Sequence, residues 1–472
     1  MMDWKQLLNC ERFYMGSKEG GVTSGGEVRS EFQRDYDRAL FSSAVRRLQH
    51  KAQVFPLEPN DRVRNRLTHS LEVSCIARSL AERWLSGTKR EIDDEVRGGI
   101  AAVCATAGLL HDLGNPPFGH AGEAAIAEWF AGKGEKVWGD ALDGDDDDAK
   151  WARADFLKFE GNAQTMRIVL KLQSLLGESG LNLTYGTLSA CRKYVGRSVD
   201  VDKTDQGKKK PGWFRTEREQ IVKIEAQTGT GVNGSLVGMR HPLTYLVEAA
   251  DDIVYCTGDL EDGLSKGILD WEQVKRELEV RLEGEIGEKV AAMAEHIDGQ
   301  LDHHIGSHDR GERNVVAGQL LRTRLIGVLI ESVVEGFEAK YDQIMCGVFK
   351  GELVVEAGMG AVVKACKGVG YDHVYGVTSN VKLEVLGRKV IMDLLDLFWD
   401  AVRGYEGKAS LRGYDAKVWE LISPNYRGLF ERWYEKAADD AARWELKLHL
   451  VTDYVCGMTD HYARQIHREL LG

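Results

Sequence analysis

Apolar residues recur at spacings of three and four through most of this chain, and this period constrains its fold more than any other feature. Proline, which interrupts helices, occurs only 7 times in 472 residues. Alternation with period two is confined to short pieces at 352–356 and 373–378, which would form at most a small β ribbon. We therefore predict an all-α fold, with helices over residues 68–86, 97–111, 242–260, 314–340, 381–403 and 440–470.

The composition excludes several classes of protein. With 62 basic and 74 acidic side chains, the net charge of −12 argues against non-specific binding of nucleic acid by the whole surface. There is no apolar run long enough to span a membrane, and the start MMDWKQLLNCERFY lacks the apolar core of a signal peptide. The 8 cysteines include no C-x-x-C pair, which is typical of reduced thiols. We expect a soluble, cytoplasmic protein.

The segment most informative about chemistry is GLLHDLGNPPFGHAGE, residues 108–123. His111 and Asp112 end an apolar run that begins at Ile100, and the sequence GNP that follows would break a helix. Two ionisable side chains at the inner end of a buried helix are costly unless they bind something. Taken alone, however, such a pair is more often structural, with the histidine hydrogen-bonded to its neighbour.

Two other predicted helices carry an ionisable side chain on their inward face. The stripe that starts at His69 continues through apolar residues at i+4, i+7 and i+11, and Asp251 interrupts a second apolar stripe. Two histidines and two aspartates form the mixed nitrogen and oxygen set that suits a divalent metal with open positions for water and substrate. We therefore predict a single-metal site held by His69, His111, Asp112 and Asp251.

The order of these four residues resembles the H…HD…D signature of the HD-domain metal-dependent phosphohydrolases. Within that superfamily the chain resembles the deoxyguanosinetriphosphate triphosphohydrolase (dGTPase) family. The resemblance lies in seven collinear blocks, at residues 41–49, 66–73, 111–123, 159–165, 180–184, 240–253 and 453–460. A bare His-Asp pair is a weak signal, whereas seven ordered blocks are specific. Residues 265–440 match least well.

Composition and the spread of the motifs suggest three parts. Residues 1–33 include a run of glycine, serine and charged residues, and we expect a mobile N-terminal segment there. Residues 34–265 would form the HD-domain catalytic core, because the motifs require them to fold together. Residues 266–472 would form a helical part that completes the substrate pocket and makes subunit contacts. Within the core, residues 196–220 have low hydrophobicity and three consecutive lysines, and we expect an exposed basic loop.

The resemblance implies hydrolysis of a deoxynucleoside triphosphate (dNTP), with dGTP giving deoxyguanosine and tripolyphosphate as the first candidate. The metal would be Mn²⁺ or Mg²⁺, although a site of this composition also tolerates Co²⁺, Ni²⁺ or Fe²⁺. Breaking the P–O5′ bond leaves an alkoxide that benefits from a proton donor. His120 is the candidate for that donor, and Glu123, at i+3, would orient its imidazole. The family assigns acid–base work to these two positions.

Substrate contacts can be proposed at further positions. Arg66 lies one helical turn before His69 and should reach the same cavity. Tyr255 and Asp259 follow Asp251 by one and two turns, where they would contact the deoxyribose, although a core aromatic and a surface charge are the plainer interpretations. We expect Asp252, which follows Asp251 and points elsewhere, to form a salt bridge or to support a ligand from behind. The other positions that resemble family contacts are Gln53 for the sugar, Lys193, Tyr194 and Lys210 for phosphate, Arg46 or Arg47 for phosphate, and Glu160 and Asn162 without an assigned role.

Two alternatives stay open at this point. The first is an HD phosphohydrolase that acts on another nucleotide, such as a nucleoside monophosphate, a cyclic nucleotide or an alarmone. The second is a dNTP-sensing or single-stranded-DNA-binding protein with reduced catalysis, which the presence of all four ligands, His120 and Glu123 argues against. As partners we expect a dNTP substrate, a dNTP effector, further copies of the chain and, given the negative charge, only weak binding of single-stranded DNA. No membrane partner is expected.

Overall fold

The structure, a computed structural model, describes residues 1–14, 29–58, 60–173, 179–305 and 309–472. Within these ranges the regular structure is helical, and β pairing is limited to isolated bridges such as the one between Arg12 and Thr184. The prediction of an all-α fold is therefore confirmed. Among the described residues, no helix is both long and apolar enough to span a membrane.

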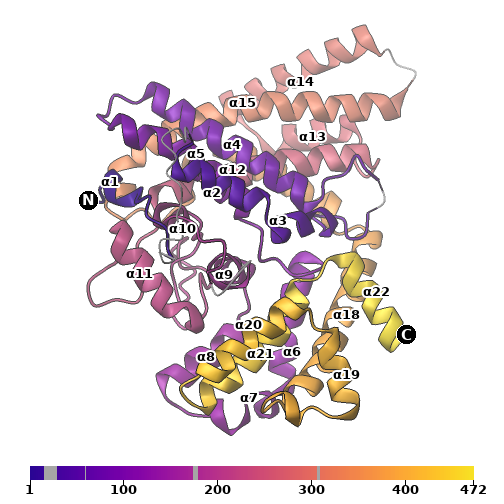
Figure 1. Ribbon diagram of the computed structural model, residues 1–472. Coiled ribbons are helices and arrows are strands. Elements are labelled where there is room, and N and C mark those ends of the chain that lie inside the picture. The colour runs from indigo at the N-terminus through magenta and orange to yellow at the C-terminus, as the bar shows by residue number, and fades with distance from the viewer. Residues whose placement is uncertain (15–28, 59, 174–178, 306–308) are drawn as a thin grey trace.

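The helices form two lobes (Figure 1). The larger lobe consists of α1 (Trp4–Leu7), α2 (Glu31–Leu40), α3 (Ser43–Arg47), α4 (Arg66–Gly87), α5 (Asp94–Leu110), α9 (Gly161–Arg167), α10 (Tyr185–Ala190), α11 (Arg218–Thr228), α12 (Pro242–Ser265), α13 (Trp271–Arg281), α14 (Gly284–His304), α15 (Arg310–Met345), α16 (Leu353–Glu356) and α17 (Gly360–Gly370). The smaller lobe consists of α6 (Gly119–Lys133), α7 (Glu135–Leu142), α8 (Asp147–Leu157), α18 (Thr378–Val402), α19 (Gly413–Leu421), α20 (Pro424–Lys436), α21 (Asp440–Cys456) and α22 (Asp460–Leu471).

The lobes do not divide at residue 265, where the sequence suggested a boundary. Helices α15 and α17 pack against α12, so the main hydrophobic core of the larger lobe extends well beyond that residue. The core of the smaller lobe combines α6, α7 and α8 with α18 to α22. Each lobe is thus built from segments distant in sequence, because the apolar faces of the later helices are completed by earlier ones.

Local sequence explains where the site-bearing helices begin. Asn65 and Thr68 form reciprocal capping hydrogen bonds at the start of α4. Helix α12 begins at Pro242, whose missing N–H costs nothing in a first turn. The helix predicted over 440–470 is two helices, because Thr459 accepts a hydrogen bond from the Tyr462 N–H and thereby caps α22.

Two predictions about irregular segments were wrong. The pieces expected to form a β ribbon are instead helical, in α16 and in a π-helical turn, η4 (Tyr371–Tyr375). Short apolar runs do not distinguish a strand from a buried helical turn. The expected exposed basic loop is folded into the body, since Trp213 and Phe214 are fully buried.

The N-terminal segment predicted to be mobile, residues 1–33, falls partly on residues 15–28, which lie outside the described residues. In the described part, Trp4 and Leu7 are buried, and the indole N–H of Trp4 donates to the hydroxyl of Tyr341 at 2.7 Å. Helix α2 already begins at Glu31. The first 14 residues therefore belong to the folded body because their apolar side chains fill the core.

Candidate metal centre and active site

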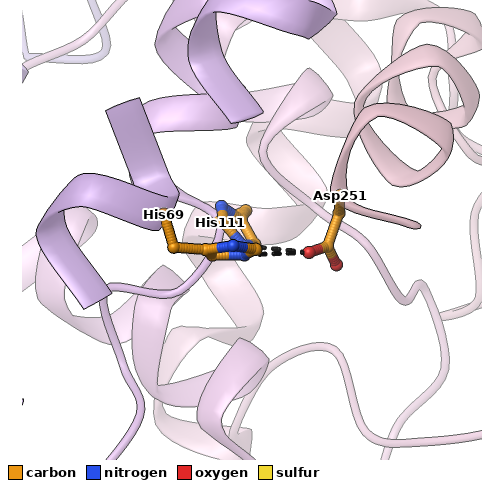
Figure 2. Close-up of side chains that lie close together, drawn as sticks. All are labelled: His69, His111 and Asp251. Carbon is orange, nitrogen blue, oxygen red and sulfur yellow. Dashed lines mark hydrogen bonds and ion pairs between the residues drawn. The ribbon is translucent and has the colours of Figure 1, made fainter. Parts of the chain in front are cut away.

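Three helical elements of the larger lobe bring three of the predicted ligands together. His69 lies in the second turn of α4, His111 directly follows α5, and Asp251 lies in the middle of α12. Figure 2 shows both imidazole rings directed at the carboxylate of Asp251. The candidate ligand atoms of these three residues all lie within 4.8 Å of one another.

The two imidazoles share one carboxylate oxygen. Nε2 of His69 lies 3.2 Å from Oδ1 of Asp251, and Nε2 of His111 lies 3.4 Å from the same atom. The two rings are 5.2 Å apart between centroids. Although burial raises it, the pKa of Asp251 lies well below its ordinary value, because Lys193 and His111 stabilise the carboxylate. The carboxylate is thus ionised, as a metal ligand must be.

The donor set of this cluster fits a divalent metal. Nδ1 of His111 is 2.7 Å from the carbonyl oxygen of Gly108, so this nitrogen carries the proton and donates. In the neutral ring that a metal would bind, Nε2 would therefore carry the lone pair, and this buried atom has no hydrogen-bond partner among the described residues. A buried imidazole nitrogen with a free lone pair, beside an ionised carboxylate, is an arrangement that a metal ion satisfies.

Asp112 lies beside this cluster, but its carboxylate is turned toward other partners. Its Oδ1 is 3.6 Å from Nε2 of His111 and accepts a hydrogen bond from Nδ2 of Asn115 at 2.8 Å. Its Oδ2 accepts a hydrogen bond from the guanidinium of Arg66. Burial would raise the pKa of Asp112, but Arg66 and His111 hold it below its ordinary value. Arg66, predicted as a substrate contact, thus binds and orients a predicted ligand.

The candidate acid–base pair begins the smaller lobe. Nδ1 of His120 lies 2.9 Å from Oε2 of Glu123, and the imidazole is 84% exposed whereas the carboxylate is 10% exposed. The other oxygen of Glu123 accepts a hydrogen bond from the Gly161 N–H at 2.8 Å. The hydrogen bond with Glu123 raises the pKa of His120. Glu123 therefore both fixes the imidazole and favours its protonated form.

Gly161 connects this pair to the metal centre. A Cβ at this position would overlap Oδ1 of Asn115 and lie 2.7 Å from Oε1 of Glu123. The absence of a side chain lets Asn115, which bonds Asp112, and Glu123, which bonds His120, approach the same backbone. The side chain that bonds the predicted ligand and the side chain that bonds the candidate acid therefore meet at the backbone of Gly161.

Cationic side chains surround the cluster. Nζ of Lys193 is 3.1 Å from Oδ2 of Asp251, and Nζ of Lys210 is 2.7 Å from Glu160. Nδ2 of Asn162 also donates to Glu160, at 2.8 Å. A small cavity beside the cluster is lined by Ala107, His111, Asn162, Ala190, Cys191, Lys193, Thr244, Val247, Glu248 and Asp251. The structure thus brings Lys193 and Asn162 to one cavity with the candidate ligands.

The side chains predicted to contact phosphate differ in their surroundings. Tyr194 is buried, and burial raises its pKa to about 12. The carboxylate of Glu160 near Lys210 raises the pKa of this lysine, which burial alone would lower. Arg46 donates a hydrogen bond to the carbonyl oxygen of Phe41, and Arg47 donates one to the hydroxyl of Ser43.

Two of the predicted sugar-binding residues, Tyr255 and Asp259, lie near a tyrosine that the sequence did not single out. The hydroxyl of Tyr375, in η4, donates a hydrogen bond to the carboxylate of Asp259. Its ring is 6.2 Å from that of Tyr255. Asp259 is buried, and burial raises its pKa to about 7. Oε1 of Gln53 is buried and has no hydrogen-bond partner within the described part of the chain.

Two further contacts bear on the sequence analysis. Asp252 pairs with Nζ of Lys367 at 2.6 Å, as the prediction of a salt bridge requires. Lys51, which was not singled out, is buried and donates to the carbonyl oxygens of Asn115 at 2.6 Å and Cys456 at 2.7 Å. Neither Lys51 nor Tyr375 could be found from local spacing, since their partners are remote in sequence.

The helical fold and the convergence of His69, His111 and Asp251 define a hydrolase of the HD class, whose domain binds a divalent metal. The HD domain family matches residues 66–181, which contain both histidines.

Full-length relatives narrow the class. The chain is 37% identical to a deoxyguanosinetriphosphate triphosphohydrolase-like protein of Listeria monocytogenes, over 100% of both chains. It is 32% identical to a protein of the same name from Pseudomonas aeruginosa, over 100% of this chain and 99% of the relative. It is 29% identical to a deoxyguanosinetriphosphate triphosphohydrolase of Salmonella typhimurium, with the same coverage. The chain belongs to the deoxyguanosinetriphosphate triphosphohydrolase family.

Proposed function

We propose that the protein hydrolyses a dNTP to the deoxynucleoside and tripolyphosphate, with dGTP as the first candidate. The observation that carries the proposal is the placement of Lys193 at one cavity with His111 and Asp251. A metal-ligating cluster beside a half-buried cation suits a polyphosphate, whose negative charge both can neutralise. The names of the full-length relatives support dGTP in particular.

His69, His111 and Asp251 would hold the metal, Mn²⁺ or Mg²⁺ or another divalent ion, and Asp112 would be the fourth ligand. When bound, such an ion supplies polarisation of a phosphoryl oxygen and activation of a water. Arg66 and Asn115 hold Asp112 in its ionised form and in one orientation. The Gly108 carbonyl fixes the tautomer of His111 in the same way.

His120 would donate the proton to the O5′ leaving group. Its exposed imidazole is free to meet a substrate, while Glu123 holds Nδ1 and leaves Nε2 as the donor. Glu123 itself is fixed by the Gly161 N–H. The pair therefore presents one defined N–H, in the protonated form that a general acid requires.

Lys193, Lys210 and Tyr194 would bind the phosphates. Lys193 and Lys210 both retain their charge, because carboxylates beside them raise the pKa that burial lowers. Asn162 lines the same cavity and could donate to a phosphate oxygen, while Glu160 would keep Lys210 in place. Arg46 and Arg47 stay weaker candidates for this role.

Tyr255, Asp259 and Gln53 would contact the deoxyribose. Asp259 and the unpartnered oxygen of Gln53 can each accept a hydrogen bond from the 3′-hydroxyl. The rings of Tyr255 and Tyr375 would leave no room for a 2′-hydroxyl. We therefore propose that this end of the site selects a deoxyribose over a ribose.

Assembly and regulation form a separate part of the proposal. We expect a homo-oligomer and activation by a dNTP effector, and only weak binding of single-stranded DNA at a net charge of −12. Light scattering at micromolar protein concentration tests whether the protein is a homo-oligomer, and a mass equal to that of one chain would contradict this expectation.

Product analysis tests the reaction. The protein would be incubated with Mn²⁺ and each of the four dNTPs, alone and mixed, and the products separated by anion exchange. Tripolyphosphate with a deoxynucleoside supports the proposal and identifies the base, and activity in the mixture alone indicates an effector. Orthophosphate as the product would favour another nucleotide substrate. Unchanged rates after His111→Ala and Asp112→Ala would contradict a role for the metal centre.

A further inference from the structure

The loop between α5 and α6 sets the distance between the candidate metal centre and the candidate acid. Asp112 stands near its start, the loop ends at Phe118, and His120 is the second residue of α6. The loop crosses from the larger lobe to the smaller one (Figure 1). Any movement of its backbone would therefore displace His120 relative to the ligands on α4, α5 and α12.

One carboxylate from the C-terminal part binds this loop. Asp460, the first residue of α22, is 1% exposed, and its Oδ1 accepts a hydrogen bond from the Phe118 N–H at 3.0 Å. Its Oδ2 accepts a hydrogen bond from the Ala52 N–H, also at 3.0 Å. Ala52 directly precedes Gln53 of the predicted sugar site. One buried side chain thus joins two segments of the active site.

The Phe118 turn needs such a restraint. Phe118 has a φ of 62°, in the left-handed region that residues with a Cβ rarely adopt, and Gly119 follows with a φ of 57°. This pair of left-handed residues starts α6 and so aims His120. A strained turn persists only where neighbouring contacts hold it, and the bond from Asp460 is one of these contacts.

Lys51 holds the same loop at a second point. Its buried ammonium group binds the carbonyl oxygen of Asn115 and that of Cys456, at the end of α21. The loop is therefore attached to the C-terminal helices at Asn115 through Lys51 and at Phe118 through Asp460.

We propose that Asp460 is a positioning residue for the reaction, which fixes the Phe118 turn and thereby holds His120 at its working distance from the metal centre. The inference rests on the proposed function. Asp460 contacts no candidate ligand and neither member of the His120–Glu123 pair, so it acts through the loop backbone.

Asp460→Asn tests this role, because the amide keeps the shape of the side chain but its nitrogen cannot accept a hydrogen bond. The variant would be assayed with a dNTP and with its analogue in which sulfur replaces the bridging O5′. A thiolate leaves without a proton, so the analogue needs no acid. Wild-type protein, Asp439→Asn and Asp460→Asn would be compared. Asp439 is an exposed cap of α21, which accepts from the Ala442 N–H at 2.8 Å.

We expect Asp460→Asn to lower kcat for the dNTP by about 10²-fold but to lower kcat for the thio analogue by only about threefold. This difference is expected because a misplaced acid slows only the reaction that needs a proton donor. Asp439→Asn should change neither value. An equal loss with both substrates, or no loss, would overturn the inference. If Asp460→Asn does not fold, Lys51→Gln, which frees the Asn115 carbonyl, replaces it. We expect the same ratio between the loss of kcat for the dNTP and the loss for the thio analogue. An equal loss with both substrates again overturns the inference. If wild-type protein releases no tripolyphosphate, the proposed function itself has failed.

Discussion

Nδ1 of His120 lies 2.9 Å from Oε2 of Glu123, one turn further along α6. The histidine is exposed and the glutamate is buried, so the carboxylate acts on the imidazole from the protein side. The hydrogen bond raises the pKa of His120. Burial would raise the pKa of Glu123, but His120 holds it below its ordinary value. The charged pair is therefore the favoured form of both groups.

The first prediction concerns the pH dependence of catalysis. A histidine that acts as an acid is active while protonated, and activity falls as the pH rises through its pKa. Glu123→Gln removes the carboxylate that raises this pKa, so the alkaline limb of kcat should move to lower pH. His120→Ala should lower kcat by about 10²- to 10⁴-fold. Glu128→Gln, on the exposed face of α6, is the control. An alkaline limb at the same pH in Glu123→Gln would refute the assignment.

The second prediction concerns metal binding. Asp251→Asn removes the negative charge that His69 and His111 share, and we expect Mn²⁺ affinity to fall by about 10²-fold or more. Asp252→Asn, at the adjacent position, should retain the affinity, because Asp252 pairs with Lys367 instead. Calorimetric titration of the metal-free proteins with Mn²⁺ measures the affinity of both variants. Equal affinity in the two variants would show that Asp251 is no ligand.

The third prediction concerns the sugar end of the site. Tyr375→Phe removes the hydroxyl that donates to Asp259, and the KM for a dNTP should rise about tenfold at pH 7. Burial already raises the pKa of Asp259 to about 7, and loss of the donor raises it further. Because a carboxyl ionises above its pKa and then accepts more strongly, the defect should shrink at higher pH. Tyr371→Phe, 75% exposed, is the control. A KM that does not change would remove Tyr375 from the site.

The fourth prediction concerns stability. The guanidinium of Arg167, 1% exposed, donates to Asp453 and Glu217 at 2.8 Å each, and links α9 to α21. Arg167→Met leaves two carboxylates buried without this partner, and should lower the free energy of unfolding by about 3–5 kcal/mol. Arg388→Met breaks an exposed pair with Glu128 and should cost less than about 1 kcal/mol. Urea unfolding of both variants measures the difference, and similar midpoints would contradict the prediction.

Local sequence was enough to predict the helices and the inward faces of His69 and Asp251, because a helical period places side chains that are three or four residues apart on one face. The same reasoning paired His120 with Glu123 at i+3. Local sequence was not enough to predict the burial of Trp213 and Phe214 within residues 196–220. That burial depends on partners distant in sequence, such as Phe159, whose ring packs against Phe214.

By itself, then, the sequence predicted the all-α fold and indicated the candidate ligands and the candidate acid–base pair, since a helical period and local spacing place each side chain on a face of its own helix or turn. Only the tertiary structure decided that Arg66 orients Asp112, that Tyr375 meets Asp259, and that Asp460 binds the Phe118 turn. These contacts join residues from separate elements, and such contacts form only when those elements have packed against one another. The division into lobes has the same cause, because an apolar face identifies a helix as packed but does not say against which other helix it packs.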